Sequence, residues 1–144
     1  MAQQTQTREG EHYTIHAALV KDSESHRMEC TLHGLVAQAA ALYRDRNAVC
    51  FQPYNSPPVY FTYQEMFQMA EELTLFLRSH PLESKTIGLY CHPGVLLPSW
   101  ILGILRVPAA YSPVDPAAPP PFTSSLIQRC KIRYMLVEED KVEV

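Results

Sequence analysis

The chain has 144 residues, the length of one modest domain, and its shares of hydrophobic (47%) and charged (19%) residues are ordinary for a globular protein. The formal net charge of −3 at pH 7 gives no basic surface of the kind that nucleic-acid-binding proteins carry. The longest apolar run, residues 94–105, is interrupted by Pro98, Ser99 and Gly103 and is too short to span a bilayer. The totals therefore argue against nucleic acid and membrane as partners.

Residues 1–30 are polar and have no sustained periodicity, which is typical of a disordered tail. Within them, residues 13–20 carry enough apolar side chains for one short strand. The segment has three basic and five acidic residues and no apolar stretch like that of a signal peptide, whereas a mitochondrial presequence is rich in arginine and poor in acidic residues. We therefore expect a cytoplasmic protein with a disordered tail over residues 1–30 and a domain over residues 31–144.

The first predicted helix covers about residues 32–44. Thr31 is a good N-cap, and the apolar residues after it recur at helical spacing. They are Leu32, Leu35, Val36, Ala39 and Tyr43. Residues 48–51 and 59–62 then have the composition of short strands. Because the Asn-Ser-Pro-Pro sequence between them is a strong turn signal, we expect them to pair as a hairpin.

A second helix is predicted over residues 63–79. It opens with a capping box, in which the Thr62 side chain accepts from the Glu65 amide while the Glu65 side chain reaches back. Six apolar residues of this helix form one stripe, namely Met66, Met69, Ala70, Leu73, Phe76 and Leu77. A stripe of this kind is more often part of a hydrophobic core than a cofactor site.

The remaining elements alternate between strand and helix. We predict strands at 87–91, 110–114 and 133–137, a helix at 97–106 and a short helix near 126–130. Pro98 is compatible with the helix only in its first turn, where a missing N–H costs little, and Pro108 ends that helix. Such alternation predicts parallel strands joined by right-handed helical crossovers. The expected fold class is therefore α/β, a mostly parallel sheet with flanking helices.

The cysteines and histidines do not predict a metal site. The four cysteines form no Cys-x-x-Cys motif, and no His-Glu-x-x-His motif occurs. Cys91 and His92 are adjacent, but neighbouring side chains point in different directions, so chance neighbours are favoured over a nucleophile with its base. We expect reduced thiols and no metal ligand.

Two signatures resemble those of adenylate-forming (AMP-binding) enzymes. Residues 61–66 read Phe-Thr-Tyr-Gln-Glu-Met, similar to the superfamily's Leu-Thr-Tyr-x-Glu-Leu. Residues 102–116 read Leu-Gly-Ile-Leu-Arg-Val-Pro-Ala-Ala-Tyr-Ser-Pro-Val-Asp-Pro, which resembles a helix ending in Leu-Lys-Ala-Gly followed by Ala-Tyr-x-Pro-hydrophobic-Asp-Pro. Val107 and Pro108 depart from that Ala-Gly and fit one branch of the superfamily, to which residues 87–111 are very similar. The resemblance covers roughly residues 31–140.

The resemblance implies a larger parent protein with an adenylation domain, a phosphopantetheine carrier domain and a beta-propeller. Its chemistry would join a carboxylate to ATP, giving an acyl-adenylate and pyrophosphate, and then transfer the acyl group to a pantetheine thiol. The parent would use ATP, Mg²⁺ and phosphopantetheine. Beta-alanine or another acyl substrate is suggested by the resemblance, and the expected partners are the remainder of the adenylation domain and the carrier domain.

No catalytic, cofactor-binding or metal residue is assigned from the sequence. The superfamily grips the triphosphate with a Ser/Thr/Gly-rich loop, whereas the five glycines of this chain are widely separated and form no such loop. Tyr111 and Asp115, near the end of a predicted strand, could line a ligand crevice, but architectural roles are favoured. A small basic cluster comprises Arg129, Lys131 and Arg133, and we expect it to be a solvated surface.

The sequence leaves three interpretations of the function. The leading one is a truncated N-terminal portion of an acid-activating ligase, inactive by itself and binding no cofactor. The second is a non-catalytic short isoform that acts as an interaction module through its uncovered apolar face. The third, a free-standing nucleotide binder of α/β type, is disfavoured by the missing glycine-rich loop.

Overall fold

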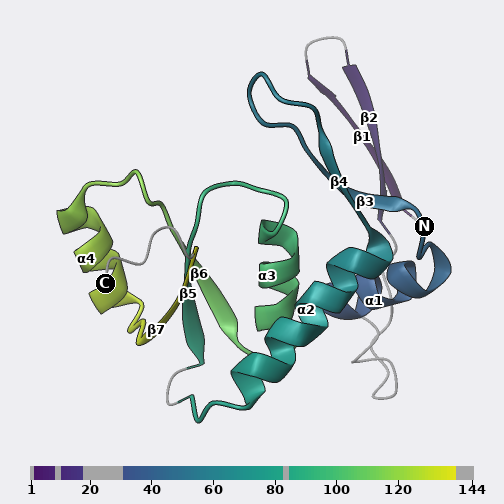
Figure 1. The fold of residues 1–144 in the computed structure, drawn as a ribbon. Coiled ribbons are helices and arrows are strands. Elements are labelled where there is room, and N and C mark those ends of the chain that lie inside the picture. The colour runs from purple at the N-terminus through teal and green to yellow at the C-terminus, as the bar shows by residue number, and fades with distance from the viewer. Residues whose placement is uncertain (1, 9–10, 18–30, 83–84, 139–144) are drawn as a thin grey trace. The chain divides into compact units, whose positions relative to one another are not determined.

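A computed structural model describes residues 2–8, 11–17, 31–82 and 85–138 (Figure 1). The chain divides into two compact units, Met1–Thr31 and Leu32–Val144. Among the described residues, no helix combines the length and the apolar content needed to cross a membrane.

In the first unit, two strands form an antiparallel hairpin. They are β1 (Ala2–Arg8) and β2 (Glu11–Ala17), with Ala2 opposite Ala17 and Arg8 opposite Glu11. The sequence predicts only one short strand here, over 13–20, because β1 has no alternating apolar residues that would mark it. Residues 18–30 lie outside the described residues. That residues 1–30 behave as a disordered tail stays a prediction.

The second unit begins with a helix and a hairpin, as the sequence predicts. Helix α1 is Leu32–Leu42, and the strands β3 (Asn47–Phe51) and β4 (Val59–Thr62) pair antiparallel. In the turn between them Asn55 has a φ of 55°, a left-handed conformation that asparagine tolerates better than most residues.

The capping box at the start of α2 (Tyr63–Arg78) is confirmed. The Thr62 N–H donates to the Glu65 carboxylate at 2.8 Å, and the Glu65 N–H donates to Thr62 Oγ1 at 3.2 Å. The hydrogen bonds from the Thr62 backbone and side chain hold the pKa of Glu65 below its ordinary value. These contacts fix where α2 begins.

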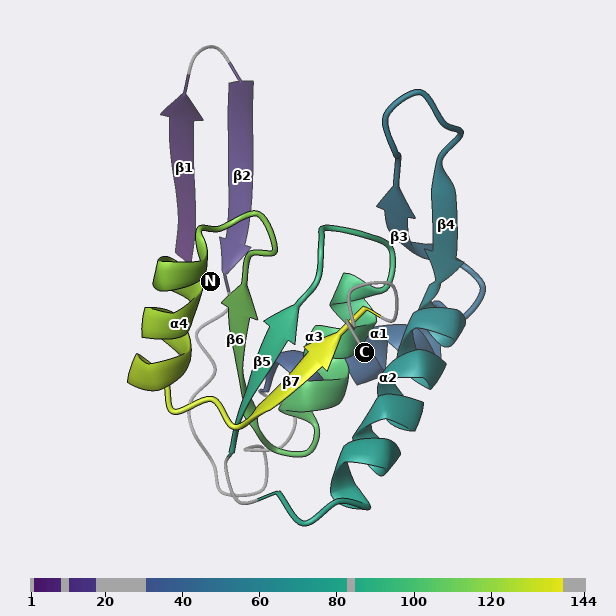
Figure 2. The same ribbon diagram turned by 60° about the vertical axis from the view of Figure 1, so that its left-hand side comes forward.

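A three-stranded parallel sheet forms the centre of the second unit, which confirms the predicted α/β class. Its strands are β5 (Thr86–Tyr90), β6 (Ala110–Val114) and β7 (Tyr134–Val137), in the spatial order β6-β5-β7 (Figure 2). The connecting helices α3 (Leu97–Leu105) and α4 (Pro120–Arg129) lie on opposite sides of the sheet (Figure 1). Pro98 lies in the first turn of α3, as expected.

The core lies between the sheet, α3 and α2. Ile87 and Leu89 on β5 are buried together with Leu77 of α2 and Ile104 of α3. Helices α2 and α3 approach closely at Gly103, where an added Cβ would lie 2.9 Å from Leu73 Cδ2 and 3.0 Å from the Ala70 carbonyl oxygen. This close contact requires glycine at that position.

One predicted core position of α2 is corrected by the structure. Phe76, placed on the core stripe of α2, is 56% exposed and its ring lies against His80, while Thr74 is buried instead. Thr74 tolerates burial because its hydroxyl donates to the carbonyls of Ala70 at 2.8 Å and Gly103 at 3.0 Å.

The predicted apolar face of α1 is largely uncovered. Leu32, Leu35 and Tyr43 are exposed, and Ala40 is the buried residue of this helix among those described. Periodicity identifies which residues share a face of a helix, but it does not show whether another element packs against that face.

Candidate functional site

The carboxyl ends of the three parallel strands meet at one edge of the sheet. Tyr90 at the end of β5 pairs with Val114 of β6 on one side and with Val137 of β7 on the other. In open α/β sheets, ligands bind in a crevice at this edge. The chain segments that leave these strand ends are therefore the first place to look for a site.

A crevice of about 350 Å³ lies at this edge, and we call it the carboxyl-edge crevice. Its walls come from the β3–β4 hairpin, the β5–α3 connection, the first turns of α3 and the end of β7. The lining residues are Phe51, Pro53, Val59, Cys91, His92, Gly94, Val95, Leu96, Leu97, Trp100 and Glu138. Most of these side chains are apolar.

The local sequence after β5 explains how α3 comes to line the crevice. Pro93 and Gly94 turn the chain, and the Leu97 N–H donates to the Gly94 carbonyl at 3.3 Å. The Trp100 N–H then donates to the Leu96 carbonyl at 3.1 Å, which closes the first helical turn. Leu96, Leu97 and Trp100 therefore contribute to one wall of the crevice.

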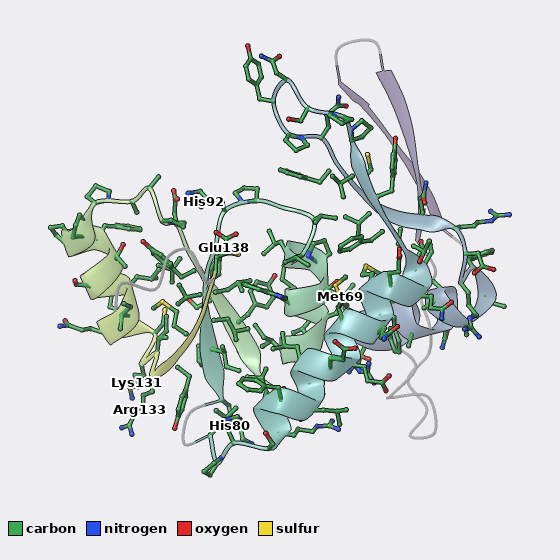
Figure 3. The ribbon with its side chains drawn as sticks, viewed as in Figure 1. Met69, His80, His92, Lys131, Arg133 and Glu138 are labelled. Atoms are coloured by element: carbon green, nitrogen blue, oxygen red, sulfur yellow. The ribbon has the colours of Figure 1, made fainter. Side chains whose placement is uncertain are left out.

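A histidine and a carboxylate lie at the crevice. His92 Nδ1 is 3.5 Å from Glu138 Oε2, and Figure 3 shows both residues at the strand ends. The His92 and Glu138 side chains are 51% and 31% exposed, so the pair contributes little to stability. Its effect is on charge, since a protonated His92 offsets the Glu138 carboxylate.

Cys91 is a poor nucleophile in this setting. Burial raises the pKa of the Cys91 thiol, and the negative charge of Glu138 raises it further. A raised pKa reduces the fraction of reactive thiolate. The neighbouring His92 contacts Glu138 through Nδ1, so the geometry gives no support to a Cys91–His92 catalytic pair.

The candidate residues named from the sequence lie elsewhere. Asp115 stabilises the turn after β6, because its Oδ1 accepts from the Ala117 N–H at 2.9 Å. Neither Tyr111 nor Asp115 lines the carboxyl-edge crevice. The basic cluster of Arg129, Lys131 and Arg133 lies where α4 leads into the amino end of β7 (Figure 3).

Sequence reasoning missed the crevice because its walls are far apart in the chain. Phe51 and Val59 precede Trp100 by about 40 residues or more, and Glu138 comes 38 residues after it. A local signal was the apolar run from Val95 to Leu97 shortly after a buried strand, at a place where α/β sheets bind ligands.

Sequence reasoning also missed one histidine spacing. His12 and His16 form a His-x-x-x-His pair, which on a helix places two imidazoles one turn apart. Both residues belong to the extended strand β2, where four residues span about 13 Å. Within the described part of the chain, no three His, Cys, Asp or Glu side chains gather where a metal ion could bind.

Comparison with curated proteins finds relatives of one kind at substantial identity. The chain is similar to the beta-alanine-activating enzymes of Mus musculus (47% identity over 115 residues), Homo sapiens (48% over 115) and Danio rerio (44% over 110). The alignments cover 76–78% of this chain and 10% of each relative. The chain thus spans about a tenth of the length of these relatives.

Solved structures show the same fold. A fatty acid AMP ligase from Legionella pneumophila matches with a TM-score of 0.72 at 18% identity, over 82% of this chain and 21% of that one. The N-terminal subdomain of Klebsiella oxytoca NpsA matches with a TM-score of 0.66 at 18% identity, over 78% and 28%.

The sequence model of one protein family, the AMP-binding enzymes, matches residues 36–144, which is nearly the whole second unit. The two signatures noted in the sequence, at 61–66 and 102–116, fall inside this match. The chain therefore belongs to the AMP-binding enzyme family.

Proposed function

We propose that this chain forms the N-terminal part of an ATP-dependent, acid-activating ligase. The whole protein would join a carboxylate to ATP, release pyrophosphate and pass the acyl group from the adenylate to a pantetheine thiol. The observation that carries the proposal is the family match along residues 36–144. Identity of 44–48% with beta-alanine-activating enzymes supports the same chemistry.

Beta-alanine is the proposed acid, because the relatives with 47% and 48% identity are named for its activation; other acyl acids are the alternative. ATP and Mg²⁺ would serve the adenylation step and phosphopantetheine the transfer. The proposed partners are the remainder of the adenylation domain and a carrier domain. The cytoplasmic location stays a prediction from the sequence.

We further propose that the 144 residues do not activate an acid by themselves. Adenylation requires the carboxylate and the α-phosphorus to be held together, and enzymes gain much of their rate from such placement. It also requires donors that offset the charge of the phosphates, and losing a single such donor typically costs roughly 10²–10³ in rate. The 144 residues contain no Ser/Thr/Gly-rich loop that would supply them.

The acid specificity is tested on a longer protein that covers more of the length of the relatives. Each acid of a panel, beta-alanine included, is incubated with ATP, Mg²⁺ and hydroxylamine, which traps an acyl-adenylate as a hydroxamate. Beta-alanine is expected to give the highest yield of hydroxamate. A hydroxamate yield with beta-alanine no higher than without any acid would reject beta-alanine as the substrate.

A non-catalytic interaction module is the second candidate, and the uncovered leucines of α1 favour it. The messenger RNA downstream of the Val144 codon distinguishes the two candidates. An open frame encoding the phosphate-binding loop, found in independent transcripts, supports the ligase. A stop codon at the same place in those transcripts supports the module.

A further inference from the structure

The carboxyl-edge crevice has the size and lining of a small-molecule site. Its volume of about 350 Å³ lies within the range of ligand pockets, roughly 300–1,000 Å³. Phe51, Val59, Leu97 and Trp100 from three different elements provide apolar walls. Such walls offer dispersion contacts and remove apolar ligand surface from water.

The charges at the crevice argue against a charged occupant. The Glu138 carboxylate lines the crevice 3.5 Å from His92 Nδ1, and its negative charge disfavours an anionic ligand. Burying an isolated ionised group against the apolar walls would be costly. A triphosphate or a zwitterionic amino acid therefore fits poorly. An uncharged hydrocarbon group fits better, because it gives up no hydrogen bonds or charge solvation when it leaves water.

A second hollow among the described residues of this unit has a different character. The groove between α1 and α2, about 630 Å³, is bordered by Arg44, Glu71 and Glu72. Those charged side chains make it a weaker candidate for an apolar ligand than the carboxyl-edge crevice, although it is larger.

We propose that the carboxyl-edge crevice binds a small uncharged hydrocarbon group, such as an unbranched alkyl chain. The proposal rests on the lining and charges of the crevice and does not require the ligase activity. It fails separately from that activity, because binding is measured on the 144-residue chain and acid activation on the longer protein.

Trp100 makes the crevice directly observable. It is the single tryptophan of the 144 residues and it lines the crevice, so the intrinsic fluorescence reports on this site. The probe is 1-octanol, with beta-alanine as the polar comparison. We expect 1-octanol to shift the Trp100 emission to shorter wavelength with a saturable dose dependence, and beta-alanine to leave the emission unchanged.

A matched pair of variants locates the binding. Leu96→Asp places a carboxylate in the crevice wall, and since Leu96 lies at the N-terminus of α3, the helix dipole favours a negative charge there. Phe122→Asp makes the same kind of change in the first turn of α4, where Phe122 is exposed and lies outside the crevice. We expect Leu96→Asp to weaken 1-octanol binding at least tenfold and Phe122→Asp to leave it unchanged.

Several results would overturn the proposal. One is a fluorescence response that rises linearly without saturation, and another is an equal response in the Leu96→Asp variant. A Trp100 emission that is already blue-shifted without 1-octanol, and does not respond to it, would mean that protein fills the crevice. Circular dichroism of both variants confirms that each binding curve comes from a folded chain.

Discussion

At the scale of single residues, hydrogen bonds and close contacts determine which side chains are buried where a hydrophobicity pattern predicts the wrong ones. Thr74 is buried because both Ala70 and Gly103 accept from its hydroxyl, whereas Phe76 is left exposed two residues further along the helix. A hydrophobic pattern ranks phenylalanine above threonine for burial, since it cannot include a partner carbonyl 29 residues along the chain. The capping box was predictable because both partners lie within four residues.

The capping box makes a pH-dependent contribution to stability. Because the folded-state pKa of Glu65 is lowered by its hydrogen bonds with Thr62, its contribution is fully present above the unfolded-state pKa. It is lost as the pH falls through the lower, folded-state pKa. We expect Glu65→Gln to remove this part of the pH dependence below about pH 4.3, the ordinary pKa of glutamate. Urea unfolding from pH 3 to 7 measures it.

The Thr62 side chain is tested by Thr62→Ala, which should cost about 1 kcal/mol of unfolding free energy at neutral pH. Thr123, within α4, is the comparison, and Thr123→Ala should change stability by less than about 0.5 kcal/mol. Equal losses in the two variants would show that the cap does not stabilise α2.

The close contact at Gly103 predicts whether an alanine there raises or lowers the stability of the fold. Glycine to alanine inside a helix normally stabilises by up to about 1 kcal/mol. Here the new Cβ would meet the Ala70 carbonyl at 3.0 Å and Leu73 at 2.9 Å, so we expect Gly103→Ala to destabilise by about 1–3 kcal/mol. Gly94→Ala is the control, because its nearest neighbour would be 3.8 Å away. A Gly103→Ala variant as stable as the parent would contradict the described contact between α2 and α3.

At the scale of elements, most of the fold could be predicted from the sequence. Strong local signals mark α2, the β3–β4 hairpin and the strand–helix alternation, and the structure confirms them together with the parallel sheet. The packing of α1 and the carboxyl-edge crevice could not be predicted, since both depend on which distant elements meet. Phe51, Val59 and Trp100 line the same crevice through tertiary packing that no local pattern records.

The next prediction tests whether the exposed face of α1 is covered by another element. Leu42 is 74% exposed, and Leu77 on α2 is 5% exposed. We expect Leu42→Ala to change the unfolding free energy by less than about 0.5 kcal/mol and Leu77→Ala to lower it by about 2–5 kcal/mol. Urea titration followed by circular dichroism compares the two. A large loss for Leu42→Ala would show that another element covers this face.

At the scale of the whole molecule, the chain consists of two compact units, and the family match lies wholly in the second, at residues 36–144. We therefore expect the first unit to be dispensable for the stability of the second. Deleting residues 1–30 should leave the urea midpoint of the second unit unchanged, and amide exchange should find no protection before Thr31. A lowered midpoint, or slow exchange in residues 2–17, would contradict this prediction.

ATP–pyrophosphate exchange, measured side by side on the 144-residue chain and on the longer protein, tests the central claim most directly. The assay contains Mg²⁺ and beta-alanine, with a panel of fatty and amino acids as alternatives and with contaminating synthetases excluded. The account predicts beta-alanine-dependent exchange by the longer protein and none above the buffer control by the 144 residues. Exchange by the 144-residue chain, or none by the longer protein with any acid, would contradict it.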